Sequence, residues 1–200
     1  MNRAVGEFYW SMLPATGRLL DLGCGDGSIG RWRPERSVVV VGMDSDPKCI
    51  AVASEHEEAL LWDLDDGRPL PFEDASFDAV VAKDILEHLQ RPWLLVREIR
   101  RVLRPGGRVL ASVICDNPRK VWSDYTHVRG FTQSTARLLF EHQGLTVARI
   151  WRMGPVPLAS RASMLWVVPF VLKLPGFRQL WFSSFELMAV RPAVVSQTTR

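Results

Sequence analysis

A glycine-rich segment and a later acidic residue form the pattern with the clearest chemical meaning. The segment Gly23-Cys-Gly-Asp-Gly27 follows the leucine-rich segment 18–22, and Asp44 comes just after the apolar run 37–43, 21 residues after Gly23. Glycines let backbone approach a ligand closely, and a carboxylate at the end of a second strand can accept both hydroxyls of a ribose. The pattern therefore indicates a nucleotide-binding site.

The glycine spacing narrows the choice of nucleotide. Dinucleotide-binding loops have the pattern G-x-G-x-x-G, whereas this loop reads G-x-G-x-G because position 28 is serine. No Gly-Lys-Ser/Thr triplet follows the loop, which excludes a phosphate-binding P-loop. The two tyrosines, Tyr9 and Tyr125, offer no convincing Tyr/Lys pair for an NAD or nucleotide-sugar oxidoreductase.

Alternating apolar runs and helical segments must position this loop. The pattern predicts strands at 18–22, 37–43, 59–62, 77–82, 108–114, 145–151 and 184–190. It predicts helices that begin near Ser28, after an Asp46 cap, at Pro92 and at 131–132, with 105–107 as a stop between helix and strand. Leu138, Leu139 and Phe140 are expected to face inward. Such alternation is typical of a three-layer α/β fold.

Five segments in order resemble one known family, the class I S-adenosylmethionine-dependent methyltransferases, most closely their type 11 branch of small-molecule enzymes. The segments are DLGCGDGSIG at 21–30, VVVVGMDSDP at 38–47, WDLDD at 62–66, LPFEDASFDAVVAKDILEHL at 70–89 and EIRRVLRPGGRVLASV at 98–113. The resemblance covers about residues 15–152. It implies a Rossmann-like, mostly parallel sheet of seven strands, the last of them antiparallel, with S-adenosylmethionine across the carboxyl ends of the strands.

The same resemblance assigns residues to the cofactor. Asp44 matches the ribose-binding acid, Asp63 the contact to the adenine amino group, and the Leu64 N–H the contact to the ring; Asp65 or Asp66 are alternatives to Asp63, and a helix cap is the alternative role for Asp44. Cys24 is expected to fit a tight loop rather than to act as a nucleophile. The complete set is Asp21, Gly23, Cys24, Gly25, Gly27, Asp44, Ser45, Asp63, Leu64 and Lys83.

Catalytic candidates follow the fourth and fifth strands. Methyl transfer needs alignment and exclusion of water, and a general base only where the acceptor is a hydroxyl. Asp84 and His88 lie in KDILEH, four residues apart, so that Asp84 would orient His88. His127 lies in DYTHVRGFT at 124–132, which resembles a segment of family members that act on glycans, lipids or quinone-like acceptors. The alternative is that Asp84, Glu87 and His88 cap and pack the following segment and that His127 has a structural role in its loop. No metal ligands are assigned.

The charge distribution suggests what the two halves bind. Residues 1–90 hold 8 Lys/Arg and 17 Asp/Glu, whereas residues 91–200 hold 17 and 5. The acidic half suits a cationic sulfonium, and the basic half predicts an anionic small-molecule, lipid or glycan acceptor near Arg119, Lys120 and Arg129. Uneven surface decoration is the alternative. Nucleic acid is not an expected partner, because the basic residues are dispersed and no recognised binding module is present.

The domain organisation expected is one domain over 1–191, with a core at 15–152, a lid or acceptor insert at 153–182 and a flexible tail at 192–200. Segment 155–182, with its prolines and tryptophans, would form the lid or floor of the acceptor pocket or dock on a membrane surface. Three cysteines, an odd number without metal-ligand spacing, favour a reducing cytoplasm over a disulfide framework or zinc module. No feature specifies an oligomeric state. A cofactor-binding regulatory or scaffold protein, of a methionine-biosynthesis-associated type, is the alternative function.

Overall fold

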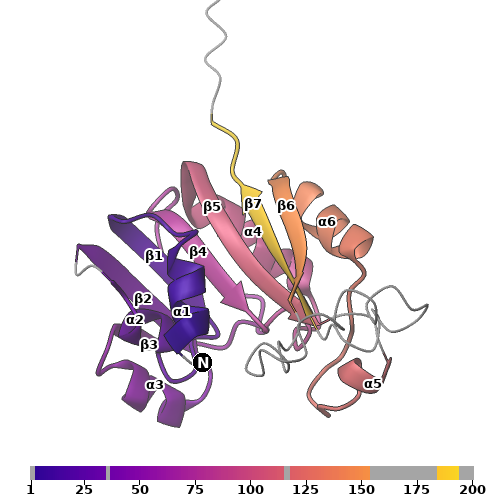
Figure 1. Cartoon of the computed structure of the whole chain (residues 1–200), viewed down its shortest axis with the longest axis horizontal. Coiled ribbons are helices and arrows are strands. Elements are labelled where there is room, and N and C mark those ends of the chain that lie inside the picture. The colour runs from indigo at the N-terminus through magenta and orange to yellow at the C-terminus, as the bar shows by residue number, and fades with distance from the viewer. Residues whose placement is uncertain (1–2, 35–36, 115–117, 154–183, 194–200) are drawn as a thin grey trace, which may run out of the picture.

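The computed structural model describes residues 3–34, 37–114, 118–153 and 184–193. Within these residues seven strands form one sheet in the order β3-β2-β1-β4-β5-β7-β6 (Figure 1). Pairing is parallel from β3 to β5, and β7 is antiparallel to both of its neighbours. This confirms the predicted fold. The strands are β1 Gly17–Leu22, β2 Val38–Asp44, β3 Glu58–Leu61, β4 Phe77–Lys83, β5 Leu103–Ile114, β6 Thr146–Met153 and β7 Ser184–Val190.

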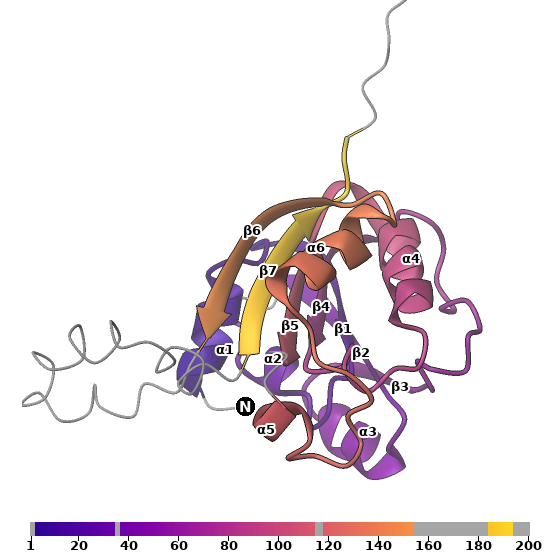
Figure 2. The ribbon, with the colours of Figure 1, turned by 90° about the vertical axis from the view of Figure 1, so that its right-hand side faces the viewer.

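Helices cover both faces of this sheet. α4 and α6 lie on one face and α1 on the other, which Figure 2 shows from the side. The short helix α5 lies near the edge where the parallel strands end (Figure 1). The helices are α1 Arg3–Trp10, α2 Ser28–Arg31, α3 Pro47–Ala53, α4 Pro92–Val102, α5 Pro118–Val121 and α6 Gln133–Glu141.

The first strand shows why the sheet is buried on both faces. Leu20 and Leu22 belong to the core cluster that includes Ile99 of α4, whereas Leu19 packs in the cluster that includes Tyr9 of α1. All three leucines of the strand are fully buried. Alternate side chains therefore enter opposite cores, which gives the nearly continuous apolar run that is typical of a central parallel strand.

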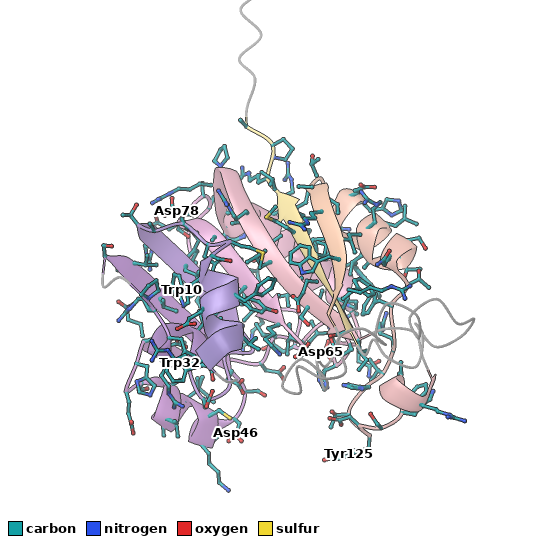
Figure 3. All side chains as sticks on the ribbon, in the orientation of Figure 1. Trp10, Trp32, Asp46, Asp65, Asp78 and Tyr125 are labelled. Atoms are coloured by element: carbon teal, nitrogen blue, oxygen red, sulfur yellow. The ribbon has the colours of Figure 1, made fainter. Side chains whose placement is uncertain are left out.

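The order of the strands places the functional edge. β2 and β3 lie on one side of β1, and β4 and β5 lie on the other, so the chain changes direction between β1 and β4. Ligands of open α/β sheets bind at such a switch point, outside the carboxyl ends of the strands. Asp46 and Asp65 lie toward this edge in Figure 3, and Asp78 lies at the opposite edge.

Two predicted details are wrong. β5 begins at Leu103 rather than 108, because the 105–107 turn is absorbed into the strand: Phe77 pairs with Leu103, Ala79 with Arg108, and the register shifts between them. Leu138 is 49% exposed instead of facing the core, whereas Phe140 is fully buried. The reason is that only one face of the nine-residue helix α6 meets the core.

Helix α1 was not predicted, and several predictions fall outside the described residues. These are the lid, acceptor or membrane roles of 155–182, which lies within 154–183, and the tail beyond 193. Among the described residues, no helix combines the length and apolar character that crossing a membrane requires.

Candidate functional site

The glycine loop is hydrogen-bonded to the end of β2. The backbone N–H groups of Gly23 and Cys24 both donate to the carbonyl of Met43, at 2.8 and 3.0 Å. Gly23 and Gly25 have φ values of 72° and 55°, in the left-handed region that other residues rarely adopt. The loop therefore turns sharply just after β1, with its backbone exposed toward the carboxyl edge of the sheet.

Asp44 lies beside this loop rather than serving as a helix cap. Its Oδ2 accepts the N–H of Gly25 at 2.9 Å, and its Oδ1 accepts the N–H of Asp46 at 3.0 Å. The cap of α3 is Asp46, whose carboxylate accepts the N–H of Lys48 at 2.8 Å. The strand end and the loop thus place a carboxylate next to the site that the glycines open.

Two cavities meet at Gly23. The smaller, of about 170 Å³, is lined by Gly23, Asp44, Ser45, Trp62, Asp63, Leu64, Asp65, Ile85, His88 and Leu89. The larger, of about 360 Å³, is lined by Val5, Asp21, Gly23, Cys24, Gly25, Asp26, Ser28, Ile29, Lys83 and Asp84. Every residue predicted for the cofactor lines one of them, except Gly27. Together they have the layout expected for a nucleoside with an amino-acid tail.

Gly27 has a packing role. Its φ is 70°, and a Cβ built there would lie 2.8 Å from the Cα of Ala53 in α3. It also precedes the first residue of α2 as the N-cap. A glycine is thus needed at position 27 because the backbone of α3 lies too close for any side chain.

Two acidic residues after β3, Asp63 and Asp65, form part of the lining of the smaller cavity. Asp63 Oδ1 accepts the N–H of Asp65 at 2.9 Å, and Asp65 Oδ1 accepts the N–H of Gln90 at 2.9 Å. Asp66 pairs with Arg68 instead. Asp65 therefore joins this wall to the segment before α4, and Asp63 is the more exposed of the two.

Burial disfavours the charged forms of two groups that line the larger cavity, the Asp21 carboxyl and the Cys24 thiol. Burial and the nearby Glu57 raise the pKa of Asp21, which is 3% exposed, well above its usual range. Burial and neighbouring carboxylates also raise the pKa of the Cys24 thiol. Because the thiolate is the reactive form of cysteine, Cys24 is unsuited to act as a nucleophile. This favours its predicted role as a small residue in a tight loop.

Asp84 does not orient His88, contrary to the prediction. Residues 84–90 form turns rather than a helix, so a four-residue spacing does not bring the two side chains together. Asp84 accepts the Ser112 hydroxyl at 2.6 Å through Oδ1 and pairs with Lys83 through Oδ2. Its φ of 51° is unusual for a non-glycine residue, and such strained backbone clusters at functional sites.

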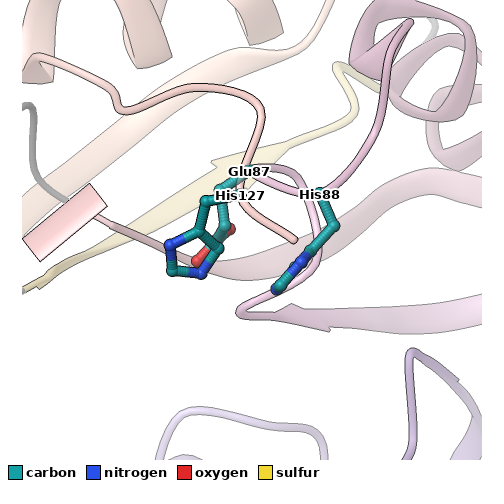
Figure 4. A group of neighbouring side chains, drawn as sticks. All are labelled: Glu87, His88 and His127. Carbon is teal, nitrogen blue, oxygen red and sulfur yellow. The ribbon is translucent and has the colours of Figure 1, made fainter. Parts of the chain in front are cut away.

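The structure brings together the two histidines that the sequence offered separately. The rings of His88 and His127 lie 4.7 Å apart between centroids. His88 Nδ1 lies 2.9 Å from Thr126 Oγ1, and His127 Nδ1 lies 2.7 Å from the carbonyl oxygen of Val121. Glu87 is 1% exposed and lies beside both rings (Figure 4). Sequence reasoning gave Glu87 only a packing role; its adjacency to His88 was the available signal.

A second buried network begins in α1, the helix that the sequence analysis missed. Tyr9 donates its hydroxyl to Glu186 Oε2 of β7 at 2.7 Å. Burial raises the pKa of Glu186 to about 7, against an ordinary value of 4.5. The folded state therefore holds this proton more tightly than the unfolded chain. The free energy of unfolding should consequently fall as pH rises through this window and level off above it.

Glu186→Gln tests this pH dependence, because glutamine still accepts the Tyr9 hydroxyl but does not ionise. The variant should match the parent near pH 5 and be more stable than the parent near pH 8, as measured by urea unfolding at each pH. Glu57, whose pKa burial also raises to about 7, leaves a residual slope in the variant. A parent-to-variant difference that is equal at both pH values would contradict the assignment. Glu141→Gln, on the surface of α6, is the control.

Comparison with known proteins places this geometry in a family. The model of a methyltransferase domain, Methyltransf_11, matches residues 20–111. Those residues include the glycine loop, Asp44 and most of the lining of both cavities. They belong to the type 11 family of class I S-adenosylmethionine-dependent methyltransferases. The cofactor of this family is S-adenosylmethionine.

Relatives of this methyltransferase domain act on small molecules according to their names. The 27-O-demethylrifamycin SV methyltransferase of Amycolatopsis mediterranei is 34% identical over 59% of this chain and 47% of its own length. The ubiquinone biosynthesis O-methyltransferase of Aeromonas salmonicida is 29% identical over 68% of this chain and 60% of its own length. Alignments to the first curated relatives thus span less than two thirds of each relative.

The fold agrees with solved methyltransferase structures. A SAM-dependent methyltransferase from Archaeoglobus fulgidus superposes with a TM-score of 0.74 and 18% identity, covering 94% of this chain and 92% of that one. At this identity the likeness concerns the fold alone, and one fold hosts many activities. The residues of the two cavities therefore carry the functional argument.

The cavity residues fit the family's cofactor. A Cβ built at Gly25 meets nothing within 4 Å, so the loop leaves open space on the side of the larger cavity that it lines. Three aspartates and one lysine line that cavity, and the excess of carboxylates suits a positively charged sulfonium. Asp44 and Asp63 would hold the nucleoside in the smaller cavity.

Proposed function

We propose that the chain is an S-adenosylmethionine-dependent methyltransferase whose acceptor is a small molecule, lipid or glycan. The observation that carries the proposal is the pair of cavities joined at Gly23, with Asp44 in one and Asp84 in the other. When bound, S-adenosylmethionine supplies an electrophilic methyl group and a neutral thioether leaving group. The chain's own residues must then bind, align and exclude water.

Each cavity would hold one end of the cofactor. Asp44 keeps a second lone pair on each carboxylate oxygen for a ribose hydroxyl, because each oxygen accepts one backbone N–H from within the chain. The lining of the larger cavity includes Lys83 and Asp84, at and just after the end of β4, together with the loop residues Cys24 and Gly25. Gly23, which lines both cavities, marks the place where the sulfur would lie.

Activation of the acceptor is assigned to His88 and His127. A hydroxyl acceptor loses its proton as the oxygen–carbon bond forms and the sulfur–carbon bond breaks, and an imidazole nitrogen is suited to take that proton. His88 lines the smaller cavity and contacts His127. Asp84, held by Ser112, is the alternative base on the larger cavity.

We propose further that the acceptor molecule is anionic. The support comes from the basic balance of residues 91–200 and from Arg119, which is exposed on α5 beside the carboxyl edge of the sheet. The guanidinium of Arg129 donates to the carbonyl of Gln90 at 2.8 Å. The side chain of Lys120 lies outside the described residues.

The test is a transfer assay with methyl-labelled S-adenosylmethionine against fractionated lipid, glycan and small-molecule extracts. We expect labelled methyl groups in at least one fraction, and the anionic fractions should contain the most label. Binding of the cofactor without transfer to any fraction would favour the scaffold alternative. Absence of both binding and transfer would contradict the proposed function.

With an acceptor in hand, His88→Ala and His127→Ala test the base. If either imidazole takes the proton of a hydroxyl, kcat for its variant should fall by about 100-fold or more. Affinity for S-adenosylhomocysteine should change little in His127→Ala, because His127 is not part of the lining of either cavity. His142→Ala, exposed after α6, is the matched control. Unchanged kcat in both variants would show that neither histidine supplies a base.

A further inference from the structure

The Glu87–His88–His127 cluster has a donor arrangement that proton transfer alone does not need. One ligand atom of each residue lies within 4.8 Å of the other two. The three side chains come from two segments far apart in sequence, which meet beyond the carboxyl ends of β4 and β5 (Figure 4). The backbone also joins these segments, since the N–H of Val128 donates to the carbonyl of Glu87 at 2.9 Å.

The hydrogen bonds fix the tautomers of both rings. A backbone carbonyl only accepts, so His127 Nδ1 carries the hydrogen that it shares with Val121. The Thr126 hydroxyl donates to Asp124 Oδ1 at 2.6 Å, so it accepts from His88 Nδ1. In the neutral ring the other nitrogen then has a free lone pair. Both histidines therefore present Nε2 as a Lewis base.

Glu87 supplies an independent sign of a missing ligand. Its side chain is buried, and its Oε2 accepts no hydrogen bond within the described residues. A buried carboxylate oxygen without a partner is costly, because it has lost its hydration and gained nothing in return. A cation between this oxygen and the two imidazoles would compensate that loss.

From this geometry we propose that Glu87, His88 and His127 bind a divalent transition-metal ion. Two imidazole nitrogens and one carboxylate oxygen are the ligand set of several zinc and iron sites, whereas Mg²⁺ prefers oxygen. A metal-bound histidine usually donates its other ring N–H to a carbonyl or another oxygen, as both histidines do here. Tetrahedral donors at zinc lie about 3.4 Å apart. The three ligand atoms here lie within 4.8 Å of one another, so they would approach one another by up to about 1.4 Å when the ion binds.

A three-ligand site leaves coordination positions open. His88 is also part of the lining of the smaller cavity, so the site borders the place assigned to the cofactor. An oxygen of the acceptor is the class of ligand that would complete the coordination. With the ion bound, both Nε2 lone pairs are occupied, so the proton of a hydroxyl acceptor would pass to the alternative base, Asp84. This last consequence rests on the proposed function, whereas metal binding itself does not.

The test is titration of tag-free, chelator-treated chain with Co²⁺, followed by visible absorption, and with Zn²⁺, followed by calorimetry. No cofactor or acceptor is added, so failure of methyl transfer cannot mask the result. We expect one ion per chain, no displacement by excess Mg²⁺, and an affinity lowered by about 100-fold or more in His88→Ala and His127→Ala. His142→Ala should bind as the parent does.

Glu87→Gln separates a ligand role from a structural one. Glutamine keeps the shape but removes the buried charge, so the metal-free variant should unfold at the same temperature as the parent or higher, yet lose the metal-dependent rise in Tm. Binding that survives all three substitutions, or that is lost in His142→Ala, would overturn the proposal. So would the absence of any binding by the folded parent, since the cluster would then be ordinary histidine packing.

Discussion

Asp44→Asn should lower the affinity for S-adenosylhomocysteine by about 100-fold, or about 2.7 kcal/mol. We propose that Asp44 accepts both ribose hydroxyls while it also accepts the N–H of Gly25. The amide replaces one charged acceptor oxygen with a donor, which weakens the sugar contact and repels one of the two N–H groups that the carboxylate accepts. Calorimetric titration of the folded variant measures the effect.

Asp46→Asn is the matched control for Asp44→Asn. Asp46 lies two residues further along, and its carboxylate caps α3 by accepting the N–H of Lys48. Asparagine caps helices about as well as aspartate, so both stability and cofactor affinity should stay near those of the parent. Equal affinities in the two variants would contradict the ribose-binding role of Asp44.

Gly25→Ala should lower cofactor affinity by about 30-fold while costing only modest stability, since a left-handed alanine costs about 1–2 kcal/mol. At Gly25 a Cβ meets nothing within 4 Å in the chain, and the residue lines the larger cavity. The methyl group would therefore stand where the cofactor is expected to contact the backbone. Affinity is measured by calorimetry and stability by urea unfolding.

Gly106→Ala provides the comparison that isolates this contact. Gly106 also has a positive φ, 81°, and a Cβ there also meets nothing within 4 Å. It lies in the 105–107 turn of β5, away from the residues that line either cavity. The two alanine variants should lose similar stability, but only Gly25→Ala should lose affinity. A similar loss of affinity in both would mean that backbone strain, not the cofactor contact, was responsible.

The sheet could be predicted because each strand has a recognisable pattern of apolar residues in its own short stretch of sequence. The run 37–43 is rich in β-branched residues, and β2 spans Val38–Asp44; the run predicted at 184–190 is β7 without change. Helix α1 escaped prediction because its partners, including Glu186, are far away in sequence. The predicted start of β5 was wrong because a turn sequence that usually separates a helix from a strand lies within the strand here, where a register shift accommodates it.

The site shows the same division between local and long-range information. The glycine loop and Asp44 are recognisable from their spacing along the chain, and Asp44 and the loop residues other than Gly27 line the two cavities. The contact of His88 with Thr126, in place of Asp84, depends on how the segment after β5 folds back over the segment after β4. A spacing of four residues suggests contact only in a helix, and residues 84–90 are turns.

A crystal structure of the chain with S-adenosylhomocysteine would locate the cofactor directly. We expect the ribose hydroxyls on the carboxylate of Asp44, the adenine between Asp63 and Leu64, and the sulfur beside Gly23. A nucleoside bound elsewhere on the chain, or bound in the cavities with its sugar away from Asp44, would show that the proposed cofactor site is wrong.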